Sequence, residues 1–209
     1  MSNSHACTEE RFLQDVANHS IKIIKDDGVH RHISFTNNGS NCYRFDLITW
    51  PGSICYTGDM GTYVFSRLDD MFKFFKMSDN DFNKNPNKQL NINPYYWGQK
   101  LQAIGTNAGY EEFDSDKFIK EVTEYYDEYI IDHPDPDKKL WEEVIYYVLN
   151  YAYDGKERAY VAISDYSSSY GLDFTDFFDG GGGDTSRYTF RYIWCLYAIV
   201  WGIQQYDKK

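Results

Sequence analysis

The feature that most limits how this chain folds is a succession of short β-prone runs between residues 20 and 66. Aromatic and β-branched residues fill these runs. The breaks between them fall at Asp27-Gly28, at Pro51-Gly52 and at Gly58-Asp59-Met60-Gly61. Such breaks are typical of the tight turns that join neighbouring antiparallel strands, with glycine wherever a turn needs a positive φ. The sequence therefore predicts a small antiparallel sheet.

Helical signals dominate from about residue 94 onward. In residues 114–132, the side chains Phe118, Val122, Tyr125 and Tyr129 follow one another at steps of four, three and four, which is the spacing of one helical face. Further helices are expected at 8–18, at 68–77 after an S-x-x-D start at Ser66, at 95–104, at 137–154, and from Thr185 or Ser186 to about Tyr206. Residues 158–164 fit either a strand or a helix.

Together these patterns predict an α+β protein with three parts. Residues 1–77 form a β-rich N-terminal part, and residues 78–93 form a polar, Asn-rich connector. Residues 94–209 form an acidic, tyrosine-rich helical part. We expect the parts to fold as one compact unit.

The net charge of −11 is unevenly distributed. Residues 1–109 hold 11 acidic residues and 11 Lys or Arg, whereas residues 110–209 hold 21 and 10. The density is highest in residues 110–137, with 11 acidic residues against two lysines. A field of this sign repels nucleic acid and attracts basic surfaces, so direct binding to DNA or RNA is not expected.

The acidic segment is also rich in tyrosine, in a chain whose aromatic content is 19%. Carboxylates one helical turn apart are about 5–6 Å from one another, which is close to the roughly 7 Å taken for phosphates along a nucleic-acid strand. An acidic, tyrosine-bearing face can therefore occupy a basic groove meant for nucleic acid; the alternative is a solvated helix face that aids solubility. The candidate partner-binding residues are Tyr110, Glu111, Glu112, Asp114, Asp116, Glu121, Glu124, Tyr125, Tyr126 and Glu128. Of these, Tyr125 also fits the core face of its helix.

No catalytic, metal or cofactor site is predicted. His30 and His32 alternate along a strand, but no spacing supplies the further ligands that a metal needs. The Gly180–Gly183 run lacks the Lys of a phosphate loop and is flanked by acidic residues that would repel phosphate. Asp59 is typical of a turn residue. The alternative interpretation is a small-molecule enzyme with a pocket at the Gly58–Gly61 turn.

The expected location is a reducing bacterial cytoplasm, without membrane insertion. The first residues lack the apolar core of a secretory leader, and the longest apolar run, residues 192–203, is too short to span a bilayer. The four cysteines form no CxxC pair, which favours free thiols.

Residues 45–75 resemble a motif of a family of uncharacterised bacteriophage and prophage proteins. The matching residues are Phe45, Trp50-Pro51-Gly52, Gly58-Asp59-Met60-Gly61, Phe65-Ser66-Arg67-Leu68 and Phe74-Phe75, within about 31 of the 209 residues. The resemblance implies a phage-encoded protein. By analogy with anti-CRISPR and anti-Gabija inhibitors, it also implies a counter-defence factor.

These observations lead to one functional hypothesis. The chain is expected to be a non-enzymatic inhibitor that binds a host antiphage defence complex on a basic nucleic-acid-binding surface. The motif residues Trp50, Pro51, Gly52, Gly58, Asp59 and Gly61 would be scaffold. Besides the enzyme, a phage structural or assembly protein remains an alternative, and a homo-oligomer is compatible with either binding role.

Overall fold

The computed structural model describes residues 6–77, 89–133, 137–168, 170–179 and 184–209. The chain divides into two compact units, and their boundaries differ from those of the predicted parts. The sheet unit comprises Met1–Glu111 and Tyr188–Lys209, and the acidic unit comprises Glu112–Arg187. The α+β class is confirmed.

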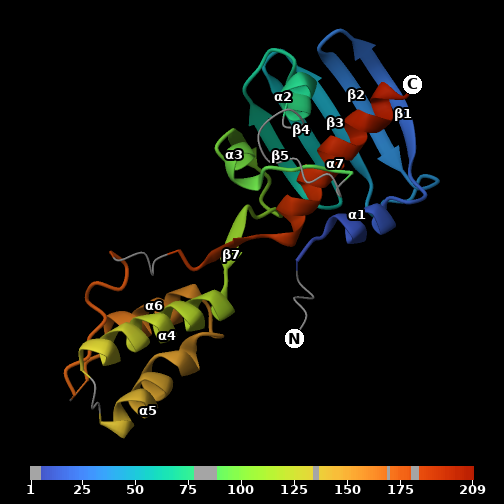
Figure 1. The fold of residues 1–209 in the computed structure, drawn as a ribbon. Coiled ribbons are helices and arrows are strands. Elements are labelled where there is room, and N and C mark those ends of the chain that lie inside the picture. Colours follow the sequence, from blue (N-terminus) through green and yellow to red (C-terminus); the bar gives the residue numbers. More distant parts are fainter. Residues whose placement is uncertain (1–5, 78–88, 134–136, 169, 180–183) are drawn as a thin grey trace. The chain divides into compact units, whose positions relative to one another are not determined.

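The sheet unit is built on a six-stranded antiparallel sheet in which each strand pairs with the next along the chain. The first five strands lie where the sequence predicts them. The strands are β1 (Ser20–Asp27), β2 (His30–Thr36), β3 (Phe45–Trp50), β4 (Ser53–Gly58), β5 (Gly61–Ser66) and β6 (Leu101–Ile104). Gly28, Gly52 and Gly61 have positive φ angles in the turns between them, as expected. The 45–65 segment is thus the centre of a meander (Figure 1).

The helix predicted over residues 95–104 is wrong in its second half. Helix α3 (Pro94–Gly98) ends after little more than one turn, and Leu101–Ile104 pairs with β5 as the edge strand β6. A free strand edge offers unpaired backbone groups to any segment that reaches it, and this tertiary gain outweighs a local helical preference.

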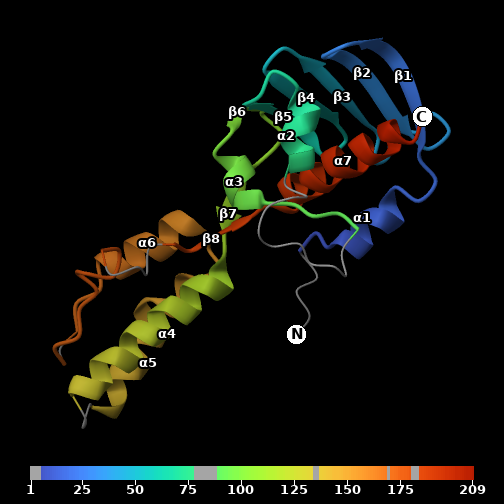
Figure 2. The same cartoon turned by 45° about the horizontal axis from the view of Figure 1, so that its top comes forward.

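Helices cover one face of the sheet. Helix α7 (Phe190–Asp207) contributes most of the helical core and lies beside α1 (Glu9–Asp15) and α2 (Met71–Met77) on that face (Figures 1 and 2). Gly202 allows the close approach of α7, because a Cβ there would lie 2.8 Å from Leu47 Cδ1. The apolar run 192–203 is therefore a buried helix, and in the described part of the chain no helix combines the length and apolarity needed to cross a bilayer.

Two helix starts differ from the sequence expectation. Thr189, rather than Thr185 or Ser186, caps α7, because Ser186 belongs to strand β8 (Ser186–Tyr188), which pairs with β7 (Glu111–Phe113). The S-x-x-D start also fails: the Ser66 hydroxyl donates to Gly52 O, and Asp70 accepts the Phe72 N–H at the start of α2. In both cases strand pairing takes up a residue that the sequence assigns to the helix start, since Ser66 lies in β5 and Ser186 lies in β8.

The acidic unit has its own apolar core. Helix α4 (Ser115–Asp132) is capped by Asp114. It buries Phe118 and Val122, which belong to the predicted apolar face. Helix α5 (Lys138–Tyr147) is shorter than the predicted 137–154 helix and is followed by the 3₁₀ helix η1 (Leu149–Tyr151). Residues 158–164, for which the sequence left two options, belong to helix α6 (Lys156–Ser164).

Candidate functional site

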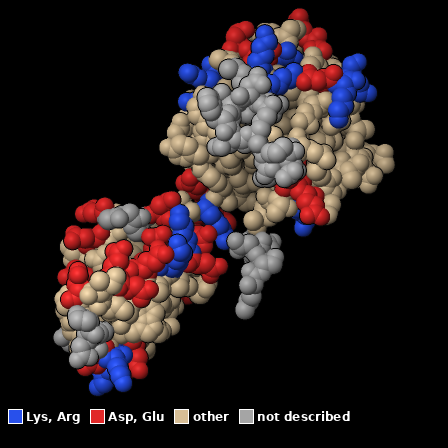
Figure 3. Space-filling view, viewed as in Figure 1, with Lys and Arg blue, Asp and Glu red and all other residues tan. Residues whose placement is uncertain are grey.

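The charge imbalance of the chain belongs entirely to the acidic unit. The acidic unit holds 19 Asp or Glu against 7 Lys or Arg, a net of −12, whereas the sheet unit holds 13 against 14, a net of +1. Figure 3 shows Asp and Glu spread over the unit that carries α4, α5 and α6. The boundaries of the two packed units thus separate charge slightly more completely than the cut after residue 109, which gives 0 and −11.

The predicted acidic residues lie mostly at the surface. Glu111, Glu112, Asp116, Glu124 and Glu128 are exposed, whereas Asp114 and Glu121 are half-buried.

Several of these carboxylates have partners within the chain. Arg187 Nε donates to Glu112 Oε1 at 2.9 Å, and Asp114 accepts from two backbone N–H groups as the cap of α4. Lys120 Nζ lies 3.2 Å from Glu124 Oε1. Since exposed ion pairs add little energy and exchange readily with water, Glu112 and Glu124 remain accessible to a basic partner.

The three predicted contact tyrosines pack internally. Tyr110 belongs to the sheet unit, where its ring meets Tyr192 at a centroid distance of 5.0 Å and burial raises its pKa to about 12. Tyr125 packs against Phe174, and Tyr126 lies 4.5 Å from the ring of Trp141.

The tyrosines that the acidic unit does expose lie after α4. Tyr146 and Tyr153 are 64% and 71% exposed, and Tyr147 and Tyr151 are 54% and 37% exposed. The sequence signal for them is the run "YYVLNYAY", whose tyrosines lie within the predicted 137–154 helix. Exposed tyrosines are typical of protein interfaces, because their rings combine apolar area with a polar tip.

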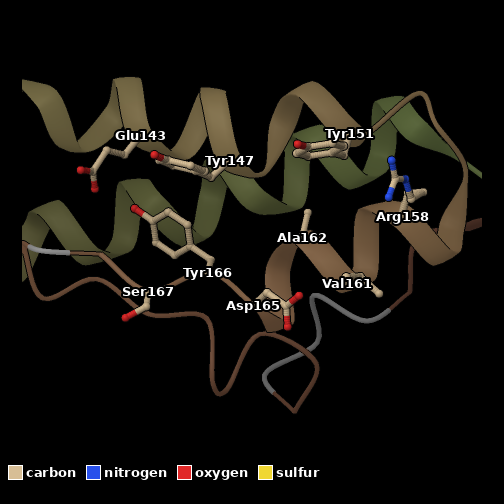
Figure 4. A pocket seen from close by; sticks show the side chains of 9 residues that line it. All are labelled: Glu143, Tyr147, Tyr151, Arg158, Val161, Ala162, Asp165, Tyr166 and Ser167. Atoms are coloured by element: carbon tan, nitrogen blue, oxygen red, sulfur yellow. The ribbon is translucent and has the colours of Figure 1, made fainter.

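A cavity of about 460 Å³, here called the tyrosine hollow, opens between the α5–η1 segment and α6 (Figure 4). Tyr147 and Tyr151 form one wall, and Val161 and Ala162 of α6 form the other. The remaining lining residues are Glu143, Arg158, Asp165, Tyr166 and Ser167. Apolar and aromatic walls with a few charged groups are the usual make-up of a binding pocket.

Tyr166 provides an unusual polar group in this hollow. Its side chain is nine-tenths buried, and its hydroxyl has no hydrogen-bond partner within the described residues. Burial raises the pKa of this hydroxyl, and the nearby Ser168 side chain partly opposes the effect without forming a well-aligned hydrogen bond to it. The Ser168 hydroxyl is itself engaged, since it donates to Glu143 and accepts the Tyr170 N–H.

A second cavity, here called the turn hollow, lies at the Gly58–Gly61 turn. It measures about 690 Å³ and is lined by Gly58, Asp59, Gly61, Thr62, Gly105, Thr106, Asn107 and Arg191. The carboxylate of Asp59 accepts the backbone N–H of Tyr43 at 2.8 Å, where Tyr43 has a positive φ of 55°. Arg191 in turn donates to Asp59 O at 3.2 Å. Asp59 therefore stabilises a loop conformation.

The rest of the motif is likewise held by backbone contacts. Gly52 donates its N–H to Asp69 O, and its carbonyl accepts from Ser66 and Arg67. Trp50 is 39% exposed and Pro51 is exposed beside it.

Of the two histidines of β2, His32 belongs to a polar cluster. His32 Nε2 and Ser34 Oγ contact the buried carboxylate of Asp46 at 2.9 and 2.7 Å, and Arg44 approaches it at 3.1 Å. These bonds link β2 to β3. Within the described residues no group of three or more His, Cys, Asp or Glu side chains could hold a metal ion, and the Gly180–Gly183 run lies outside those residues.

Comparisons with protein-family models, with curated proteins and with solved structures found no match to this chain.

Proposed function

We propose that this chain is a non-enzymatic binding protein whose acidic unit occupies a basic, nucleic-acid-binding surface of another protein. The observation that carries the proposal is the charge of −12 confined to one compact unit. That unit also exposes four tyrosines and a hollow between two of its helices.

The exposed acids of α4 follow the spacing that the proposal requires. Glu124 and Glu128 stand one helical turn apart and are both exposed, with Asp127 exposed between them. Separations of about 5–6 Å between such side chains resemble those of neighbouring phosphates, so the face can replace a nucleic-acid strand on its receptor.

The partner that we propose is a bacterial antiphage defence complex. This step rests on the resemblance of residues 45–75 to phage and prophage proteins. A defence complex that acts on nucleic acid carries the kind of basic surface that the acidic unit would occupy. Expression of the chain in bacteria that carry individual defence systems, with phage plating efficiency as readout, tests this step directly.

The binding proposal is tested by competition on immobilised DNA. Bacterial lysate is loaded on DNA-cellulose and eluted at low salt with the purified chain. We expect the wild type to release a defined set of DNA-binding proteins. The triple variant Glu124→Lys, Asp127→Lys, Glu128→Lys should release far less, because each substitution reverses a charge on the proposed face.

A matched control reverses three exposed acids of the sheet unit: Glu10→Lys, Asp27→Lys and Asp69→Lys. The control changes the net charge by the same amount but leaves the acidic unit unchanged, so it should still release the proteins. Equal release by both triple variants would show that net charge alone acts, and no release by the wild type would refute the proposal.

The turn hollow supports a second candidate, a small-molecule enzyme with Asp59 in its site. Asp59→Asn separates the two candidates. The variant keeps an oxygen that can accept the Tyr43 N–H, so the fold should survive. The binding proposal expects this variant to release DNA-binding proteins and to raise phage plating efficiency as the wild type does, whereas an enzyme would lose its activity.

A further inference from the structure

We infer that the tyrosine hollow binds an arginine side chain of the basic partner, an inference that rests on the function proposed above. The hollow then acts as a specific anchor within a binding surface that is otherwise governed by charge.

The first support is the lining of the hollow. Tyr147 and Tyr151 offer aromatic rings along one wall, while Glu143 and Asp165 contribute carboxylates (Figure 4). Aromatic faces attract cations through the negative charge above the ring, and carboxylates attract them directly. An anionic ligand would meet these two carboxylates inside a unit of net charge −12.

The second support is a guanidinium that already lies on this wall. Arg158 Cζ is 5.7 Å from the centroid of the Tyr151 ring, at one end of the hollow. Figure 4 shows Tyr147 and Glu143 farther along the same wall, away from Arg158. The chain thus contains the contact that we infer, and it leaves the Tyr147 end for a second guanidinium.

The third support is the hydroxyl of Tyr166. It is buried without a hydrogen-bond partner in the described part of the chain, and Figure 4 shows it directed toward the side of the hollow that carries Glu143 and Tyr147. A buried polar group without a partner costs free energy, which a ligand that supplies the missing hydrogen bond recovers. A guanidinium has five N–H donors in one plane, so it can contact the Glu143 carboxylate and, once a small shift of the tyrosine side chain exposes it, this buried oxygen.

These features favour arginine over lysine. A guanidinium stacks flat on a tyrosine ring and forms paired hydrogen bonds, whereas an ammonium group is compact and strongly hydrated. Arginine is also frequent on surfaces that bind phosphates, which is the kind of surface proposed for the partner.

The test is a calorimetric titration of the full chain with a hexa-arginine peptide and with a hexa-lysine peptide at low salt. We expect tighter binding of hexa-arginine. Tyr147→Ala should weaken hexa-arginine binding by about five-fold, which is the typical loss of one cation–π contact. Tyr147→Phe, which keeps the ring, should retain most of the affinity, and Glu143→Gln should weaken it.

The matched control is Tyr146→Ala. Tyr146 is the neighbouring residue and is more exposed than Tyr147, but it does not line the hollow. This variant should bind hexa-arginine like the wild type.

The outcomes separate this inference from the function on which it rests. Equal affinity for the two peptides, or equal effects of Tyr146→Ala and Tyr147→Ala, would overturn the arginine anchor and leave the charge-based proposal standing. If neither peptide bound the wild type, both would be refuted.

Discussion

Replacement of Gly58 by alanine should destabilise the sheet unit through a backbone clash. A Cβ on Gly58 would lie 2.2 Å from Arg44 O and 2.7 Å from Phe45 Cα. Both atoms belong to the main chain at the start of β3, so no side-chain rotation relieves the overlap. Gly58 does not have a positive φ, and the requirement for glycine is therefore one of space.

The cost follows from the shift that the clash demands. Ordinary contact begins at 3.4 Å, so Arg44 O must move by 3.4 − 2.2 = 1.2 Å. That oxygen also accepts the Asp59 N–H at 2.9 Å, and the bond would be strained or lost. Overpacking of this kind and one weakened hydrogen bond together cost about 3 kcal/mol, of which the lower chain entropy of alanine in the unfolded state returns roughly 0.5 kcal/mol.

Urea unfolding followed by tryptophan fluorescence measures this loss. Four of the five tryptophans belong to the sheet unit, so the signal reports mainly on that unit. With a slope of about 2 kcal/mol per molar urea, the midpoint should fall by roughly 1.2 M.

The matched control is Gly28→Ala. Gly28 has a φ of +60° and no atom within 4 Å of an added Cβ, so alanine there meets only the left-handed backbone penalty of about 1 kcal/mol. If Gly58→Ala lowered the midpoint no more than Gly28→Ala does, the steric argument would be refuted.

Three further predictions test other parts of the structure. Arg31 donates to both oxygens of Asp70; burial of Asp70 raises its pKa, but the contacts with Arg31 outweigh this and leave the pKa below its usual value. The pair therefore stabilises the fold at any pH above the ordinary carboxyl pKa, and this stabilisation is lost as the pH falls through the lowered pKa of Asp70. Asp70→Asn should therefore lose less stability than the wild type between neutral and acidic pH, as measured by urea midpoints at each pH. Asp46→Ala should cost about 2–3 kcal/mol in thermal or urea unfolding, because it leaves three polar neighbours without their acceptor. Phe118→Ala should cost the acidic unit about 3–5 kcal/mol, visible in the fluorescence of Trp141 when the other tryptophans are replaced by phenylalanine.

Elements whose signals are local could be predicted from the sequence. The turns at Gly28, Gly52 and Gly61 need positive φ angles, and strands β4 and β5 alternate between buried and half-buried positions. Helix α4 follows from the spacing of its apolar side chains. The charge imbalance was equally visible, because counting charges needs no coordinates.

Other features depend on contacts between distant residues. Residues 101–104 become a strand because β5 offers a free edge, and the helix that fills the sheet core comes from the far end of the chain. The division into two units follows from the same long-range packing. Burial of apolar side chains stabilises any segment that packs against a complementary surface, whatever the position of that segment in the sequence.

The candidate site divides in the same way. Acidic side chains on α4 are exposed because charge is costly to bury, so the sequence alone placed Glu124 and Glu128 at the surface. Tyrosine is found both in protein cores and at protein surfaces. Only packing therefore decided that Tyr125 and Tyr126 contact aromatic rings of the acidic unit, while Tyr147 is exposed to solvent. The tyrosine hollow exists because two helices and the loop after them bring residues 143–167 together, and no local pattern encodes that arrangement.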